Sequence, residues 1–294
     1  MLLGNVQSLP KAKISDIIPQ KERRNNLDFV IETIRALLSP TAWEMEIPRT
    51  YGLFHILVMV IGFSGCFFLA WRLRNLDERK NKAMILGFGI FLVVCEIYKQ
   101  LMNEVVLYPN DGYNWGNFSF QLCSIPMYLC LMIPMLKPGN LRRSLYSFLM
   151  TYNLLGGFIA FFEPSGLFHG HVTLTAHALI WHMLLVFLGA YVALSGRGCR
   201  DIRDYRRATV LFLVLCAVAF GINCGFWEIS NHQIKMFFIG PGNSPIIVFK
   251  QISEWFGWYV STLLYIPVVC LGAYLIYLLW DFVKKKIPAP AMSC

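Results

Sequence analysis

Charged residues are scarce in this sequence. Asp, Glu, Lys and Arg together make up 15% of its 294 residues, whereas 56% of the residues are hydrophobic. The mean hydropathy is +0.53. A soluble protein of this length needs a more polar surface to stay in solution, so the composition excludes a water-soluble globular domain. The sequence is instead typical of an integral membrane protein.

Several sequence signatures are also missing. The nine cysteines form no CxxC pair, so neither a disulfide framework nor a zinc ribbon is expected. No nucleic-acid-binding motif occurs, and no nucleic-acid partner is expected. The opening MLLGNVQSLPKAK lacks the basic-then-apolar order of a signal peptide, and the ending MSC is not a prenylation motif. With these signatures absent, the apolar character of the sequence is the main guide to its structure and function.

Long apolar runs predict the membrane-spanning helices. A helix needs about 20 apolar residues to cross a hydrocarbon core of roughly 30 Å. Five runs meet this length: residues 50–71, 144–162, 172–196, 208–227 and 255–280. Residues 82–106 and 117–136 are also predicted to cross, although the former carries Glu96 and Lys99. We therefore expect an all-α, polytopic membrane bundle of about seven transmembrane helices.

The distribution of lysine and arginine predicts the orientation of the bundle. The connections after the first, third and fifth spans, and the tail after the last, are rich in basic residues, whereas the other connections have few or none. Because cationic loops resist translocation, we expect the N-terminus outside and the C-terminus in the cytoplasm. The expected organisation is a polar N-terminal segment (1–49), a transmembrane domain (50–281) and a basic cytoplasmic tail (282–294). The expected location is the cell membrane in a bacterium, and an endomembrane or the plasma membrane otherwise.

Two segments outside the spans have patterns of their own. Within NNLDFVIETIRALLSP, in the N-terminal segment, apolar residues recur at helical spacing. This pattern predicts an amphipathic helix lying on the bilayer surface, and a gate over a lipid-facing entrance is the alternative. The connection EISNHQIKMFFIGPGNSP is rich in glycine and proline and is predicted to be an irregular outer loop.

Polar residues inside the predicted spans fall at matching depths. With a rise of 1.5 Å per residue, Cys123, His177 and Glu96 each lie about 8 to 9 Å below the outer surface. Asn223 falls in the same layer, and Asn153 lies nearer the middle. Polar and charged groups at such depths normally face a bundle interior or a wet cavity. The sequence therefore predicts a polar pocket near the outer side.

A thiol and an imidazole at one depth indicate nucleophilic chemistry. A buried cysteine attacks as its thiolate, which needs a neighbouring base, commonly a histidine held by a third group. Cys123 and His177 are therefore the candidate catalytic residues. The supporting candidates, which could orient the imidazole or donate to an oxyanion, are Gln121, Asn223, Glu96 and Asn153.

The same residues also have structural interpretations. Cys123 could be a small packing residue, His177 an interhelical hydrogen-bonding group, and Glu96 the ion-pair partner of Lys99. A zinc site is the rival chemistry, and its candidate ligands are Glu163, His169, His171, His177 and His182. However, two histidines five positions apart point about 140° from each other on a helix. We expect no metal and no other cofactor.

Four short motifs resemble those of a known family. FQLCSIP is similar to the Leu-Cys helix start of the YwaF-like integral membrane proteins, and TAHALIWH is similar to their histidine helix. FGINCGF resembles the family's asparagine near the end of the penultimate helix, and WFGWYV resembles its Trp-Tyr start of the last helix. The motifs keep the family's order and spacing over residues 50–280.

This resemblance implies an activity. Animal relatives in the family look like cysteine-dependent acyltransferases that move fatty acyl chains between phospholipids. By position, the resemblance makes Cys123 the acyl-accepting nucleophile and His177 its general base. The chain departs from the family pattern at Gln121, where many members have histidine.

Two functions are therefore expected as alternatives. The first is a phospholipid acyltransferase or acyl hydrolase that works through an acyl-cysteine, with membrane phospholipid and lysophospholipid as partners. The second is a non-enzymatic seven-helix transporter, or a protein that binds a lipid or another small molecule. The Glu96 and Lys99 pair favours the second function, whereas the absence of inverted repeats disfavours it. Neither function specifies an oligomeric state.

Overall fold

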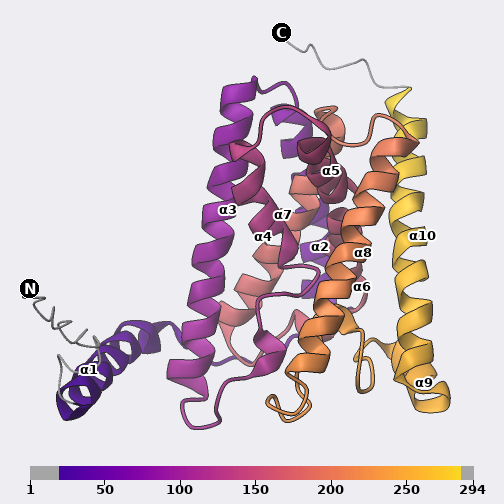
Figure 1. Cartoon of the computed structure of the whole chain (residues 1–294). Coiled ribbons are helices and arrows are strands. Elements are labelled where there is room, and N and C mark those ends of the chain that lie inside the picture. Colours follow the sequence, from indigo (N-terminus) through magenta and orange to yellow (C-terminus); the bar gives the residue numbers. More distant parts are fainter. Residues whose placement is uncertain (1–19, 286–294) are drawn as a thin grey trace, which may run out of the picture.

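Six helices are long and apolar enough to cross a membrane in the computed structural model, which describes residues 20–285. Figure 1 shows them standing side by side. They are α2 (Leu53–Leu73), α3 (Glu78–Leu101) with its π-helical continuation η3 (Met102–Leu107), the central helix (Asn140–Phe162), α7 (Val172–Leu194), α8 (Ile202–Gly225) and α10 (Trp258–Lys284). The described part of the chain has no named β-strand, and the predicted all-α membrane bundle is confirmed. The outer ends of the predicted N-terminal segment and basic tail lie outside the described residues.

The seventh predicted span, residues 117–136, is not a helix of membrane length. It begins as irregular chain, and only the short α4 (Ile125–Met132) and the 3-10 turn η5 (Ile133–Met135) are helical. Pro126 cannot donate a backbone hydrogen bond, so it suits the first turn of a helix rather than its interior. In the residues before it, the side chains of Ser119 and Gln121 bond to other segments, and the backbone is irregular with a turn at its end. Among the described residues the candidate spanning helices therefore number six rather than seven.

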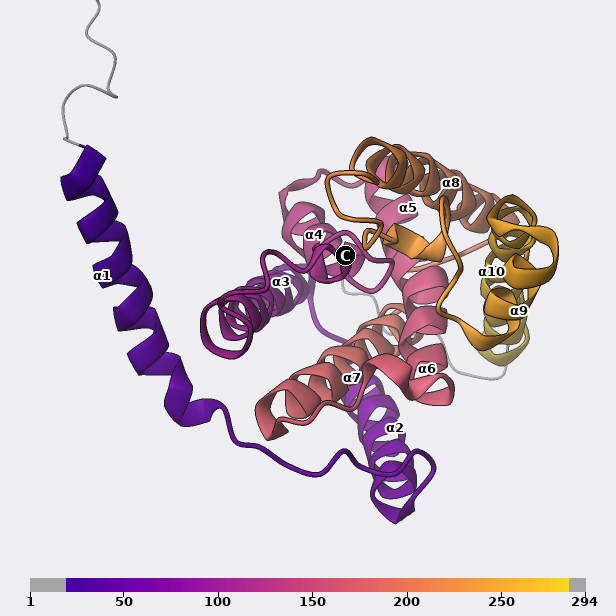
Figure 2. The ribbon, with the colours of Figure 1, turned by 90° about the horizontal axis from the view of Figure 1, so that it is seen from below.

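The centre of the bundle is a helix that changes type along its length. It consists of α5 (Asn140–Phe148), the π-helix η6 (Leu149–Asn153) and α6 (Leu154–Phe162). Figure 2 shows α5 and α6 lying between α4, α7, α8 and α10. A Cβ added to Gly189 of α7 would lie 2.6 Å from Leu154 Cβ. Glycine at this position therefore permits the close contact between α7 and the central helix.

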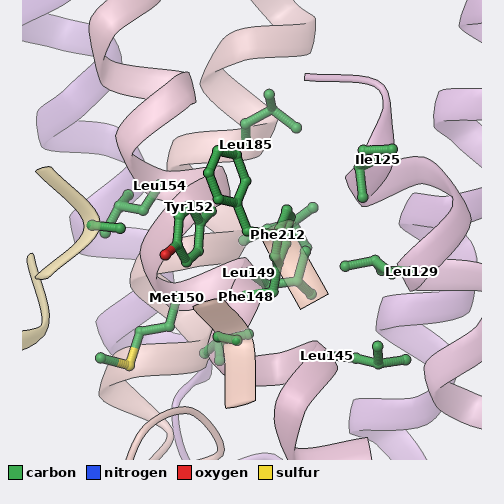
Figure 3. Packing of buried hydrophobic residues seen from close by; sticks show 14 of the residues in the cluster. Ile125, Leu129, Leu145, Phe148, Leu149, Met150, Tyr152, Leu154, Leu185 and Phe212 are labelled. Atoms are coloured by element: carbon green, nitrogen blue, oxygen red, sulfur yellow. The ribbon is translucent and has the colours of Figure 1, made fainter. Parts of the chain in front are cut away.

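Buried apolar side chains fill the space around the central helix. Figure 3 shows Tyr152 and Phe212, whose stacked rings have centroids 4.5 Å apart, together with Leu149 and Leu185. All four side chains are fully buried. By contrast, α2, α8 and α10 carry many exposed apolar side chains, such as Leu263. Their outward faces therefore suit contact with lipid rather than water.

The basic connections meet at one end of the bundle, called the basic end below, where the chain leaves α10 (Figure 1). It comprises residues 72–80, 137–143, 195–207 and 284–285. Arg197 Nη2 donates to the carbonyl oxygen of Leu76 at 2.6 Å, and Lys284 Nζ donates to that of Arg200 at 2.8 Å. The gathering of these loops agrees with the alternating basic pattern of the sequence. Which side of the membrane this end faces stays a prediction.

α1 (Gln20–Leu38) extends away from the bundle at the opposite end (Figures 1 and 2). Arg35 Nε anchors it by donating to the carbonyl oxygen of Val105 at 3.1 Å. Its exposed apolar side chains include Leu27, Phe29, Val30 and Leu37. The amphipathic helix predicted for this segment is therefore present. Its place on the bilayer surface stays a prediction, which these exposed side chains suit.

The connection between α8 and α10 is irregular, as its glycine and proline content predicts. It contains the 3-10 turn η8 (Met236–Phe238) and the short helix α9 (Ile247–Phe256). Unlike an exposed loop, its middle enters the bundle, and Met236 and Phe237 are completely buried. The apolar side chains of this turn close the end of the bundle opposite the basic end.

Candidate functional site

A cavity of about 460 Å³ opens between α3, α6, α7, the irregular segment before α4 and the connection before α10. It lies toward the end of the bundle opposite the basic end. Four of the six site residues predicted from the sequence line it, namely Glu96, Gln121, Cys123 and His177. Cys123 and His177, which the sequence places at matching depths, thus line the same cavity. We call it the thiol cavity below.

Cys123 lies in a turn immediately before α4, not inside a helix as the hydropathy predicts. The turn is closed by the backbone N–H of Ser124, which donates to the carbonyl oxygen of Gln121 at 2.8 Å. No side chain caps the helix that follows. A helix N-terminus carries a positive partial charge, which stabilises a thiolate or an oxyanion nearby. The turn therefore gives Cys123 a more favourable setting for nucleophilic chemistry than a helix interior would.

Trp181 joins the two candidate catalytic residues. Its indole Nε1 donates to the carbonyl oxygen of Cys123 at 3.0 Å. Its ring stacks on the imidazole of His177, with centroids 5.5 Å apart and an interplanar angle of 28°. Trp181 therefore fixes the turn that holds the thiol and, at the same time, the orientation of the imidazole. Trp181 is not among the site residues predicted from the sequence, although its spacing of four from His177 places both on one face of α7.

His177 has a ring nitrogen without a hydrogen-bond partner. Its Nε2 is buried, and no group in the described part of the chain bonds to it. Buried polar atoms are normally satisfied, so an exception in a cavity marks a place where a ligand or reacting group can bind. None of the four supporting residues predicted from the sequence orients the imidazole through this nitrogen.

Glu96 is the centre of a polar network at the edge of the thiol cavity. Its Oε1 accepts hydrogen bonds from Ser119 Oγ at 2.5 Å and from Gln100 Nε2 at 2.8 Å. Lys99 Nζ lies 2.8 Å from the same oxygen, so the predicted ion pair is present. Gln100 Nε2 also donates to the carbonyl oxygen of Asn117 at 2.6 Å. The network fastens α3 to the irregular segment and leaves a paired lysine in the cavity lining.

Gln121 uses both ends of its amide to hold the buried turn η8. Its Nε2 donates to the carbonyl oxygen of Lys235 at 3.1 Å, and its Oε1 accepts from the backbone N–H of Phe237 at 3.0 Å. The backbone of Phe237 is in the left-handed region, with φ 55°, which is uncommon for a residue with a side chain. Gln121 therefore helps to stabilise an unfavourable backbone turn that closes the cavity.

The two asparagines do not line the thiol cavity. Asn223 Nδ2 donates to the carbonyl oxygens of Met236 at 2.9 Å and Ile239 at 2.6 Å. Its Oδ1 accepts from the backbone N–H of Met236 at 2.7 Å. Asn153 Nδ2 donates to the carbonyl oxygen of Leu185 at 2.9 Å, which joins the central helix to α7. Both amides therefore bind backbone groups in these contacts.

Replacing Asn223 by alanine is expected to destabilise the fold. The substitution removes the side-chain partners of the buried Met236 N–H and the Ile239 carbonyl oxygen, and each such buried group left unpaired costs about 1–3 kcal/mol. Unfolding in mixed micelles measures the change in free energy. Gln233→Ala is the matched control, because Gln233 belongs to the same connection and its side chain is exposed. Equal stability of the two variants would contradict a structural role for Asn223.

The histidines do not gather into a metal site. No group of three or more His, Cys, Asp or Glu side chains that could hold a metal occurs in residues 20–285. His182 Nδ1 is within hydrogen-bonding distance of the carbonyl oxygen of Ala178, at 2.8 Å. Burial lowers the pKa of His169, in the loop before α7, below its ordinary value. This shift favours the neutral imidazole of His169, which contributes polarity to the cavity lining.

Comparison with known proteins gives one match. The model of the TMEM164 family matches residues 50–277, which run from the chain before α2 to the last turns of α10. No curated protein and no solved structure matches the chain. The matched range contains every residue of the thiol cavity.

Proposed function

This chain belongs to the TMEM164 family of membrane proteins, and on that premise we propose that it moves or releases phospholipid acyl chains. The proposed protein is a membrane-embedded acyltransferase or acyl hydrolase that works through an acyl-cysteine at Cys123. The observation that supports it most strongly is the shared cavity of Cys123 and His177, with Trp181 contacting both.

The first half of the proposed reaction forms a thioester. His177 accepts the thiol proton of Cys123, and the sulfur attacks the carbonyl carbon of a phospholipid ester. The bond between that carbon and the glycerol oxygen then breaks. The leaving lysophospholipid oxygen takes the proton from the imidazolium, so the enzyme carries the acyl group and His177 is neutral again.

The second half returns the thiol. A lysophospholipid hydroxyl, or water, attacks the thioester carbonyl while His177 accepts its proton. The carbon–sulfur bond breaks, and the thiolate recovers the proton from the imidazolium. With a lysophospholipid acceptor the protein is a transferase, and with water it is a hydrolase. The two outcomes differ only in which hydroxyl reaches the cavity.

The lining of the thiol cavity suits an acyl ester. Apolar side chains, including Ile159, Leu167 and Ile246, line it together with the polar residues. In the described part of the chain, the backbone N–H of Cys123 donates to no group of another residue. We propose that this N–H, in the turn before α4, donates to the oxyanion of the tetrahedral intermediate, as backbone donors do in acyl transfer.

A binding or transport function is the second candidate. The observation that favours it is the Glu96 and Lys99 ion pair in the cavity lining, because thiol chemistry needs no such pair. In this alternative the pair binds a polar ligand and Cys123 only packs against its neighbours. The alternative predicts that the thiol never carries an acyl group.

The intact mass of the purified protein separates the two functions. The protein is incubated in phospholipid without a lysophospholipid acceptor, and its mass is measured with and without hydroxylamine, which cleaves thioesters. Under the acyltransferase proposal, wild type gains a fatty-acyl mass that hydroxylamine removes, and Cys123→Ser lacks the labile adduct. Cys95→Ser is the matched control, since Cys95 is also half-buried but is absent from the cavity lining. A hydroxylamine-labile adduct that persists in Cys123→Ser, or no adduct together with no release of free fatty acid, would favour the binding function.

A further inference from the structure

A second cavity, of about 340 Å³, lies at the basic end. Ligand pockets in proteins typically measure about 300–1,000 Å³, so it is large enough for a small ligand. Three connections that are distant in the sequence form it: the loop between α2 and α3, the start of α5 and the loop between α7 and α8. The arginines that line it are Arg74, Arg142, Arg143, Arg197 and Arg200. We call it the arginine cavity below.

The charge of the arginine cavity is not balanced by the protein. Two carboxylates line it, Asp77 and Glu78. Asp77 caps α3 by accepting from the backbone N–H of Lys80 and also pairs with the Lys80 side chain. Glu78 is paired with an arginine, Arg142. Arg143 Nη1 lies 3.9 Å from Oδ1 of Asp204, which is outside the cavity lining. Within residues 20–285, the side chains of the other three lining arginines, Arg74, Arg197 and Arg200, form no ion pair.

A buried polar layer beneath the cavity fixes the positions of two arginines. Asn81 Nδ2 donates to the hydroxyl of Tyr146 at 2.8 Å, and the hydroxyl of Tyr191 donates to Asn81 Oδ1 at 2.9 Å. The guanidinium of Arg142 lies 5.5 Å from the ring centroid of Tyr146, and that of Arg197 lies 6.0 Å from the ring centroid of Tyr191. The cationic groups are therefore held in place before any ligand arrives.

Arg142 supplies an observation that points directly to a ligand. The residue is only 7% exposed, and its Nε is buried without a hydrogen-bond partner among the described groups. An unpartnered donor on a buried cation is costly unless an acceptor occupies the cavity. The backbone start of α5 contributes to the same lining through Gly139, and no side chain caps this helix. Both features favour an anion.

Membrane orientation alone does not explain the arrangement. The orientation rule depends on the number of basic residues in a loop, not on where their side chains point. Arg79, Arg203 and Arg206 are exposed at the basic end and lie outside the cavity lining. These three arginines favour the same membrane orientation of the chain, although their side chains do not line a common cavity. The convergence of three loops on one concave surface therefore requires another reason.

We propose that the arginine cavity binds a phosphate group. The guanidinium fork matches phosphate oxygens with two parallel hydrogen bonds, and several arginines around one site favour a group with more than one negative charge. The phosphate could belong to an anionic lipid headgroup or to a soluble molecule, because the same chemistry recognises both. The site lies at the opposite end of the bundle from the thiol cavity, so it is independent of the acyl-transfer proposal.

The test uses the full-length protein in phosphatidylcholine nanodiscs, with two probes. In the first arm inorganic pyrophosphate is titrated by calorimetry, with sodium chloride of equal ionic strength as the blank. In the second arm the nanodiscs contain phosphatidic acid, and lipid retained on the protein is counted by native mass spectrometry. Binding only in the first arm identifies a soluble phosphate, binding only in the second identifies a lipid headgroup, and binding in both confirms the shared phosphate chemistry.

Variants connect the binding to the cavity. Arg197→Gln combined with Arg200→Gln is expected to weaken binding about tenfold or more, because each removed guanidinium takes away charge-assisted hydrogen bonds. Arg203→Gln combined with Arg206→Gln removes the same charge from exposed positions outside the lining and is expected to leave binding nearly unchanged. If the first double variant does not fold, Arg74→Gln replaces it. Absence of binding in both arms, or equal weakening by cavity and control variants, would overturn the proposal.

Discussion

Replacing Cys123 by alanine is expected to reduce acyl transfer from phospholipid to lysophospholipid to the uncatalysed background. In the proposed reaction the sulfur forms the only covalent bond to the acyl group, and alanine offers no nucleophile. The measurement is the transfer of a labelled acyl chain by purified protein in mixed micelles. Because Cys123 is only half-buried and lies in a turn, the substitution removes little packing, and the fold should survive it.

The control for this prediction is Cys95→Ala. Cys95 lies on α3, is buried to a similar degree as Cys123 and is absent from the thiol cavity lining, so its loss should leave acyl transfer intact. Unfolding temperatures of both variants show whether either substitution disturbs the bundle. Full transfer activity in a folded Cys123→Ala protein would exclude the acyl-cysteine mechanism.

His177→Gln is expected to lower the rate of acyl transfer roughly 10²- to 10⁴-fold, which is the usual contribution of a general base. Glutamine keeps a polar side chain of similar length but cannot accept the thiol proton. The Nε2 of His177 has no partner in the described part of the chain, so the substitution breaks no hydrogen bond through that nitrogen. A large loss of rate with little loss of stability would therefore indicate chemistry rather than structure.

The matched control is His232→Gln. His232 is exposed in the connection after α8, where it pairs with Glu228 and stacks on Trp227. Its replacement should leave the transfer rate unchanged. A His177→Gln protein that transfers acyl chains at the wild-type rate would assign the imidazole to helix packing, where its ring stacks on Trp181.

The shared cavity of Cys123 and His177 agrees with a prediction from local geometry, although the helical rise used for that prediction does not apply to the turn that holds Cys123. Hydropathy identifies a span, and the constant rise of a helix converts a residue number into a depth. Local geometry therefore predicts one level in the membrane for Cys123, His177 and Glu96, but it does not predict which helices are neighbours. Lysine and arginine counts, which are equally local, predicted which loops share an end of the bundle.

The roles of the amide side chains could not be predicted from local patterns. Gln121 bonds to backbone groups 114 and 116 residues further along the chain. Asn223 holds the buried turn η8 through three hydrogen bonds. In the sequence both residues are candidates for catalysis, because a polar residue inside an apolar span often has a function. Their true partners are backbone atoms of a distant segment, and no sequence pattern predicts such contacts.

The sequence by itself predicted a membrane bundle and the positions of the six helices that are long enough to span, but its seventh span, residues 117–136, is wrong. It also predicted that a thiol and an imidazole lie at one level of the bundle. These properties follow from hydropathy, charge and helical rise, which act over one or two turns. Only the tertiary structure decided that residues 118–124 stay irregular, because the side chains of Ser119 and Gln121 bond to distant segments. It alone decided that arginines from three loops converge on one cavity. Such features depend on which helices become neighbours, and that depends on packing around the central helix.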